Sequence, residues 1–75
     1  MKLGNRLRRL RFEADEMSQQ ELADRVGVSR MTIYSIEKGK YTPSTLLALK
    51  MARIFNTSVE GIFFIDESEG KDDER

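Results

Sequence analysis

The 75-residue sequence predicts an all-α fold of five short helices. Apolar residues recur at spacings of three and four along most of the chain, which is the period of an amphipathic helix. Serine or threonine precedes several of these segments, where a helix N-cap is expected, and the chain contains a single proline. The only segment that suggests a strand, and does so weakly, is residues 62–65.

The first two helices are predicted from leucine spacing and from a cap. Leucines at positions 3, 7 and 10 predict a helix over residues 3–14. Ser18 and Glu21 form a capping box, in which the serine oxygen accepts a bond from a first-turn amide and the glutamate returns one. A second helix therefore begins there. Gly27 ends it, because glycine adopts a positive φ without steric cost.

Residues 19–38 supply every structural position of a helix-turn-helix. Such a motif needs a small residue where two helices cross, a turn residue that tolerates positive φ, and apolar anchors on both helices. Ala23 and Gly27 meet the first two needs, and Ser29 can cap the second helix of the pair, which stops near Gly39. A helical hairpin in a plain bundle is the alternative. The apolar anchors are Leu22, Val26, Val28, Ile33 and Ile36.

Two further helices are predicted after the single proline, Pro43. Ser44 can cap a helix that reaches about Phe55 and carries apolar residues at core spacing. Thr57 and Glu60 form a second capping box, which predicts a short fifth helix ending near residues 62–64.

The composition excludes several classes of site. The chain has no cysteine and no histidine, which removes disulfides, the common zinc sites and the commonest general base. Acidic residues do not converge in a catalytic pattern, so we predict no enzyme activity, cofactor, metal or small-molecule effector. No apolar run approaches the roughly 20 residues that span a bilayer. The N-terminus lacks a signal-peptide pattern, and we expect a cytoplasmic protein.

The charges are unevenly distributed although the formal net charge is zero. Residues 66–75 are mostly acidic and lack apolar residues, which predicts a disordered tail. Residues 1–65, predicted to be the folded domain, therefore carry a net positive charge, as a nucleic-acid-binding body would. Ordinary solvated surface would give the same surplus.

Four segments together resemble the Xre-type regulators related to phage repressor and Cro proteins, in their compact five-helix subgroup. They are Ser-Gln-Gln-Glu-Leu-Ala at 18–23, Gly-Val-Ser-Arg at 27–30, Ile-Glu-Lys-Gly-Lys at 36–40 and Pro-Ser at 43–44. The similarity covers about residues 4–64. It implies a transcriptional regulator that binds double-stranded DNA, usually as a homodimer, with the second helix of the motif in the major groove.

The chain departs from the family pattern at one position. In the family an arginine stands six residues before the Ser-Gln pair and bonds to the glutamate that corresponds to Glu37. Here Phe12 occupies that position and Arg11 comes one residue earlier. We therefore expect the connection over residues 13–17 to be one residue longer than usual, with an Arg11–Glu37 pair as a possible replacement.

The outer face of the helix after Ser29 predicts the residues that read bases. With Ile33 and Ile36 facing the core, a step of about 100° per residue turns the following side chains outward. Arg30 matches the paired acceptors of guanine, although a phosphate contact is the alternative. The predicted base-reading residues are Arg30, Met31, Tyr34 and Ser35.

Residues around this helix are predicted to hold DNA phosphates. Gln19 opens the preceding helix, whose free amides favour an anion, and it is also placed to orient Arg30. For Lys40 and Tyr41 a solvated loop is the alternative reading. The predicted phosphate-binding residues are Gln19, Lys38, Lys40, Tyr41, Thr42 and Thr45.

The apolar C-terminal segment predicts a dimer interface, since one small domain covers only a few base pairs. Leu46 and Leu49 are possible additions to it. Alternatively, Ile62 and Phe63 close the monomer core. A competing function is an antitoxin or adaptor that uses this surface to bind another protein. The predicted interface residues are Val59, Ile62, Phe63, Phe64 and Ile65.

Overall fold

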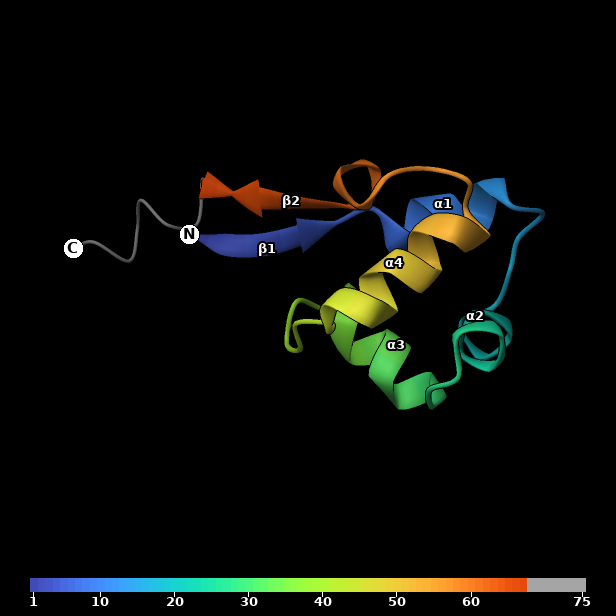
Figure 1. The fold of residues 1–75 in the computed structure, drawn as a ribbon. Coiled ribbons are helices and arrows are strands. Elements are labelled where there is room, and N and C mark those ends of the chain that lie inside the picture. The colour runs from blue at the N-terminus through green and yellow to red at the C-terminus, as the bar shows by residue number, and fades with distance from the viewer. Residues whose placement is uncertain (68–75) are drawn as a thin grey trace.

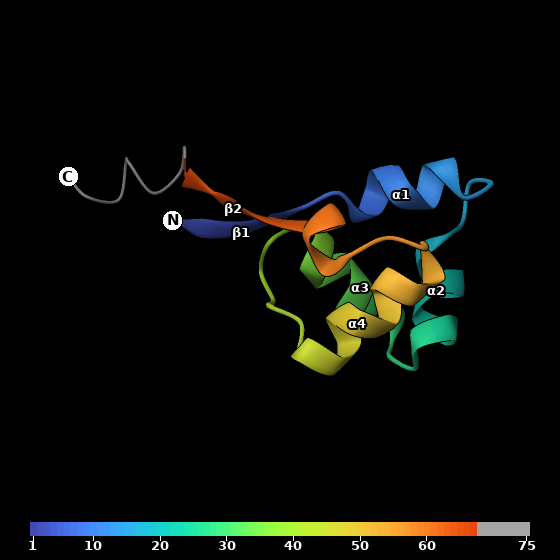
Figure 2. The ribbon, with the colours of Figure 1, turned by 45° about the horizontal axis from the view of Figure 1, so that its top comes forward.

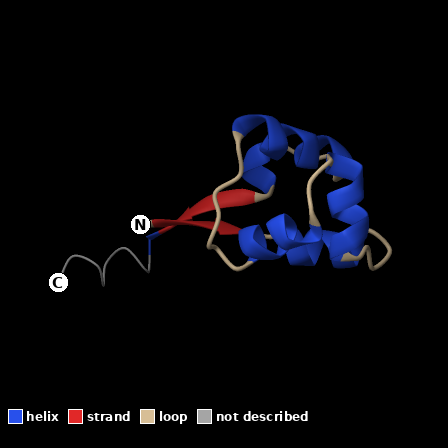
Figure 3. Ribbon diagram, turned by 90° about the horizontal axis from the view of Figure 1, so that it is seen from below, coloured by secondary structure: helices blue, strands red, loops and turns tan. Residues whose placement is uncertain are grey.

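A computed structural model describes residues 1–67 of the chain. Helices form one side of the molecule, and two antiparallel strands project from them (Figure 1, Figure 3). The elements in chain order are β1 (Lys2–Asn5), α1 (Leu7–Glu13), α2 (Gln19–Val26), α3 (Arg30–Glu37), α4 (Thr45–Ile54), the 3-10 turn η1 (Val59–Gly61) and β2 (Phe63–Asp66).

The helix expected over residues 3–14 is wrong at its start, because residues 2–5 form a strand. β1 pairs with β2, and α1 begins only at Leu7. The Asn5 side chain lies where the strand gives way to the helix, and its Oδ1 accepts a hydrogen bond from the Leu7 amide at 3.1 Å. Leu3 has helical spacing to Leu7, but it packs against the core from the strand.

The expected fifth helix is also wrong, since it is a single 3-10 turn, η1. Ser58 rather than Thr57 caps this turn, and its Oγ accepts the Gly61 amide at 3.1 Å. The chain then becomes extended, because the amides and carbonyls of residues 63–66 bond to β1. The weak strand signal over residues 62–65 corresponds to β2.

The two strands, which we call the terminal sheet, join the beginning of the chain to its end. Lys2 faces Asp66, and Gly4 faces Phe64. A Cβ on Gly4 would lie 2.6 Å from Phe64 Cζ, so the ring occupies the space that a side chain would need. The Arg6 guanidinium lies 4.5 Å from the centroid of the same ring.

The predicted serine caps of three helices are confirmed. Ser18 Oγ accepts the Glu21 amide at 2.9 Å, and Ser29 Oγ accepts the Thr32 amide at 3.2 Å. Ser44 Oγ likewise accepts the amide of Leu47 at 3.1 Å. The bond expected from the Glu21 side chain back to Ser18 is not the one observed, because the Glu21 carboxylate pairs with Arg25.

One core holds the helices and the terminal sheet together. Every helix contributes buried apolar side chains to it, and β2 contributes one. Burial of this apolar surface is the main favourable contribution to folding. The buried residues are Leu7, Met17, Leu22, Ala23, Val26, Ile33, Ile36, Leu47, Ala48, Met51, Ala52, Ile62 and Phe63.

The connection between α1 and α2 turns through two left-handed residues. Asp15 and Glu16 have φ of 63° and 58°, a conformation unfavourable for residues that have a Cβ. They return the chain so that Met17 is buried and its amide bonds to the Arg11 carbonyl at 2.8 Å. Arg11 thereby lies beside the start of α2.

Within residues 1–67, no helix combines the length and apolar character that crossing a membrane requires. Most of the acidic tail predicted over residues 66–75 lies outside the described residues. Its first residue, Asp66, belongs to β2.

Candidate nucleic-acid interface

The helices α2 and α3 meet at a tight turn. Gly27 has a φ of 81°, and the amides of Gly27 and Val28 both bond to the Ala23 carbonyl, at 2.8 and 3.0 Å. Ala23 is fully buried at this crossing. The positions predicted for a small residue and for a positive-φ glycine are therefore occupied as expected, and the alternative of a plain helical hairpin is disfavoured.

The helix α3 has one buried side and one exposed side. Ile33 and Ile36 are buried in the core. On the other side, Met31 is 55% exposed and Tyr34 is 36% exposed, although both are large and apolar. Arg30 is exposed at the first turn of the same side. Exposed apolar side chains grouped with a cation are typical of a surface that contacts a partner.

A shallow hollow runs along this outer side of α3. It lies between the helix and the loop that leads to α4. Ser35 is half-buried within it, which leaves space for a partner to approach the helix closely. The hollow is lined by Met31, Thr32, Ser35, Lys40 and Tyr41.

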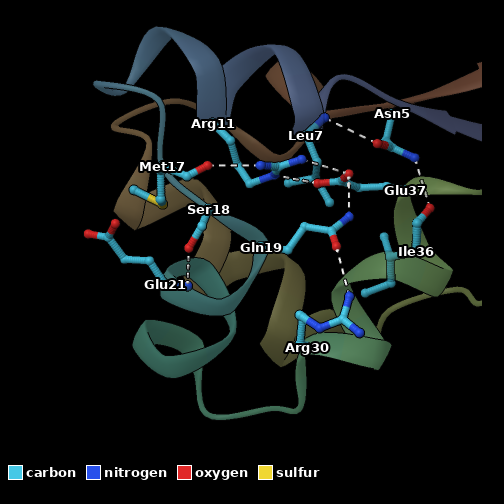
Figure 4. Close-up of polar contacts among 10 residues, drawn as sticks. All are labelled: Asn5, Leu7, Arg11, Met17, Ser18, Gln19, Glu21, Arg30, Ile36 and Glu37. Atoms are coloured by element: carbon cyan, nitrogen blue, oxygen red, sulfur yellow. Dashed lines mark hydrogen bonds and ion pairs between the residues drawn. The ribbon is translucent and has the colours of Figure 1, made fainter.

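An ion pair fixes the C-terminal end of α3 to α1. Arg11 Nε donates to Glu37 Oε2 at 2.6 Å, and Arg11 Nη2 donates to Glu37 Oε1 at 3.0 Å (Figure 4). The side chains are only 13% and 8% exposed. Arg11 Nη1 also donates to the Met17 carbonyl at 2.8 Å. The Arg11–Glu37 pair that the sequence suggested is therefore present.

Gln19 connects this ion pair to the outer side of α3. Its Nε2 donates to Glu37 Oε1 at 3.1 Å, and its Oε1 accepts from Arg30 Nη1 at 3.4 Å (Figure 4). Both ends of the amide therefore have partners within the protein. The expected orienting contact to Arg30 is present, and the side chains of Arg11, Glu37, Gln19 and Arg30 form a continuous chain.

The other residues predicted to hold phosphates follow α3 along the loop. All of them are exposed. The Lys38 ammonium lies 5.7 Å from the centroid of the Tyr34 ring, which places it beside the outer side of the helix. These residues are Lys38, Lys40, Tyr41, Thr42 and Thr45, at the loop and the start of α4.

Sequence reasoning missed a contact between the terminal sheet and α3. Asn5 Nδ2 donates to the Ile36 carbonyl at 3.0 Å (Figure 4). The two residues are far apart in the sequence, and an asparagine near an N-terminus predicts nothing about such a contact. The signal that could have revealed it is Gly4, since glycine disfavours the interior of a helix.

The residues predicted for dimerisation do not form one surface. Ile62 and Phe63 are buried in the monomer core, and Val59 packs partly against it. Their burial follows from the route of the chain, which passes from η1 into β2 over the core. The Phe64 ring packs against Gly4 and the Arg6 guanidinium, whereas Ile65 is 59% exposed. The surface on which the adaptor alternative depends is correspondingly smaller.

A different apolar surface remains exposed on α4. Leu46 is 63% exposed and Leu49 is 50% exposed. Leu49 borders a shallow groove between α4 and η1. The groove is lined by Leu49, Ala52, Arg53, Asn56, Thr57, Ser58, Val59 and Glu60.

Comparison with known proteins places this arrangement in a family. Residues 7–62 match the family model described as Helix-turn-helix. An "Uncharacterized HTH-type transcriptional regulator" of Archaeoglobus fulgidus is 60% identical over 53 residues, which are 71% of this chain and 75% of that protein. The similarly named MJ0272 of Methanocaldococcus jannaschii is 49% identical over 53 residues, 71% of this chain and 80% of that protein.

The similarity extends to a bacterial protein. The HTH-type regulator YgzD of Bacillus subtilis is 48% identical over 50 residues, which are 67% of this chain and 76% of that protein. The matched residues include both helices of the motif and the turn between them. The chain therefore belongs to the Xre/Cro-like helix-turn-helix family of DNA-binding transcriptional regulators.

Proposed function

We propose that this regulator reads a specific sequence in double-stranded DNA by placing α3 in the major groove. The observation that carries the proposal is the outer side of α3, where Arg30, Met31 and Tyr34 are exposed together. A major groove about 12 Å wide admits an α-helix, and base edges there present a distinct pattern for each base pair. Half-buried Ser35 permits close approach of the helix.

Arg30 is the residue that we assign to a guanine. Its planar guanidinium can donate two bonds to guanine O6 and N7, which discriminates against other bases by about 1–3 kcal/mol. The contact from Gln19 Oε1 at 3.4 Å limits the positions that the side chain can adopt before DNA binds. Met31 and Tyr34 offer apolar surface that suits thymine methyl groups.

Phosphate contacts on both sides of α3 would fix the register of the domain. The first turn of α2 presents free amides to an anion, at the end of the helix that carries Gln19. Across the groove, the loop residues Lys38, Lys40, Tyr41 and Thr42, together with Thr45 of α4, supply charges and hydroxyls. Such contacts position a protein on DNA and carry no sequence information directly.

The functional form that we propose is a homodimer on a two-fold operator. Two copies would place their α3 helices in half-sites about 34 Å apart. We assign the interface to Leu46, Leu49 and Val59, because the two leucines are exposed on α4 and the groove beside them contains no base-reading residue. Both α3 helices stay accessible in such a dimer. Ile65 lies outside this groove and is not part of the assignment.

Selection of bound sequences from a pool of random duplexes tests the proposal. We expect the wild-type protein to enrich a sequence with two-fold symmetry and at least one guanine in each half-site. The Arg30→Ala variant should lose the preference at that guanine. Arg8→Ala is the matched control, because Arg8 is exposed on α1, which lies across the helical body from the turn between α2 and α3 (Figure 1, Figure 2), and is not among the residues assigned to DNA contact. Failure of the wild type to enrich any sequence would contradict specific reading.

A further inference from the structure

Three lysines from two distant parts of the chain lie around Gly39, at the C-terminal end of α3. Lys38 and Lys40 flank Gly39, which has a φ of 78°. Lys2 of β1 lies across the same glycine, since a Cβ built on Gly39 would be 3.9 Å from Lys2 Cε. We call Lys2, Lys38 and Lys40 the lysine cluster.

The three side chains of the lysine cluster are exposed. The carboxylates of Glu13, Glu21 and Glu37 pair with arginines. Cations grouped in this way favour an anion that can bridge them.

The position of Lys2 is set by the fold. Asn5 joins β1 to the last turn of α3 through its 3.0 Å bond to the Ile36 carbonyl, and its Oδ1 holds the start of α1. The Arg6 amide bonds to the Ile62 carbonyl at 2.8 Å, which fixes the other end of the same short segment. From Asn5, three residues of paired strand carry the chain about 10 Å to Lys2.

We propose that Lys2 is a DNA phosphate-binding residue. The terminal sheet would then contact the DNA backbone together with the loop between α3 and α4. The lysine cluster binds neighbouring phosphates of the strand that borders the groove occupied by α3. This inference rests on the proposed function for the location of the DNA. It adds a second element, β1, to the interface and gives the terminal sheet a role beyond stabilising the fold.

A structural role for these lysines makes a different prediction. Cations near the C-terminal end of a helix stabilise it through the helix dipole. If Lys2 acted only in this way, its neutralisation would lower the stability of the free protein and would leave the salt dependence of DNA binding unchanged. Stability and salt dependence must therefore be measured on the same variants.

The test uses the full chain and the variants Lys2→Gln, Lys40→Gln and Arg8→Gln. Dissociation constants are measured between about 50 and 200 mM salt on the duplex selected above and on a duplex of unrelated sequence. Each phosphate contact adds about 0.9 to the slope of log Kd against log salt concentration. We expect Lys2→Gln and Lys40→Gln each to lower the slope by about that amount per protomer, equally on both duplexes.

The control separates a local contact from a general effect of charge. Arg8→Gln removes the same charge from α1, outside the lysine cluster, and should leave the slope unchanged. An unchanged slope for Lys2→Gln, or an equal decrease for Arg8→Gln, would overturn the proposal. Because the unrelated duplex reports the phosphate contact without sequence preference, a failure to find a preferred sequence would count against the proposed function alone.

Discussion

Arg11 and Glu37 form a two-point ion pair that joins α1 to the end of α3, with distances of 2.6 and 3.0 Å. The pair is nearly enclosed, and Gln19 extends it to Arg30 on the outer side of α3. The position of α3, the helix that we assign to the major groove, is thus fixed by the Arg11–Glu37 pair as well as by the buried side chains of Ile33 and Ile36. Removing one member of this pair is therefore expected to affect the whole motif.

Replacement of Glu37 by Gln should destabilise the protein strongly. The Arg11 charge would remain at a site that is 13% exposed, without its counter-charge. Breaking an enclosed pair in this way costs about 3–5 kcal/mol, and the measurement is the free energy of unfolding in urea. The control is Glu13→Gln, which breaks an exposed pair with Arg9 and should cost less than about 1 kcal/mol. Equal losses for the two variants would contradict this role of Glu37.

Replacement of Glu16 by Gly should stabilise the protein. Glu16 has a φ of 58°, where a residue with a Cβ is strained by about 1–2 kcal/mol and glycine is not. We expect a gain in the free energy of unfolding of about 0.5–1 kcal/mol, after the loss through greater freedom of the unfolded chain. Glu13→Gly, inside α1, should instead lose about 1 kcal/mol. A loss at Glu16 as large as that at Glu13 would show that the left-handed turn is not strained.

Replacement of Gln19 by Ala should weaken discrimination between sequences more than overall binding to DNA. The change removes the bond that holds Arg30, which is worth about 1 kcal/mol and corresponds to about a fivefold smaller ratio of specific to nonspecific affinity. Gln20→Ala is the control, because Gln20 is exposed and bonds to Asp24 on the same helix. The idea fails if the two variants have the same affinity ratio.

Replacement of Leu49 by Glu should prevent dimer formation. Leu49 is 50% exposed in the monomer, so the change should leave the fold intact while placing a charge in the proposed interface. Sedimentation equilibrium should give a monomer for this variant and a dimer for the wild type. Phe12→Glu is the control, because Phe12 is 67% exposed on α1. A wild-type protein that stays monomeric at high concentration, with and without the operator, would contradict the proposed dimer.

The helix-turn-helix could be predicted from the sequence because its signals are local. A serine cap lies within three residues of the amide that it accepts, and Gly27 adopts its positive φ at the position where the apolar pattern of α2 ends. The exposed side of α3 follows from helical periodicity alone once Ile33 and Ile36 are assigned to the core.

The terminal sheet could not be predicted in the same way, because its pairing joins residues at opposite ends of the chain. Leu3 and Leu7 have helical spacing, and only the partner strand determines that Leu3 lies in β1. The contacts of Asn5 to Ile36 and of Lys2 to Gly39 depend on that pairing. The bond from the Gln19 side-chain amide to Glu37 could not be predicted either, because Glu37 is 18 residues away in the sequence.

The most direct test of major-groove reading by Arg30 changes the DNA and the protein together. In the selected duplex, each guanine is replaced in turn by 7-deazaguanine, which lacks the N7 acceptor in the major groove but keeps its base pairing. For the wild type we predict about a tenfold loss of affinity at one guanine in each half-site, and for Arg30→Ala no loss at that position. A wild-type protein that tolerates every replacement, or an Arg30→Ala variant that loses as much affinity as the wild type at the same guanine, would contradict the assignment.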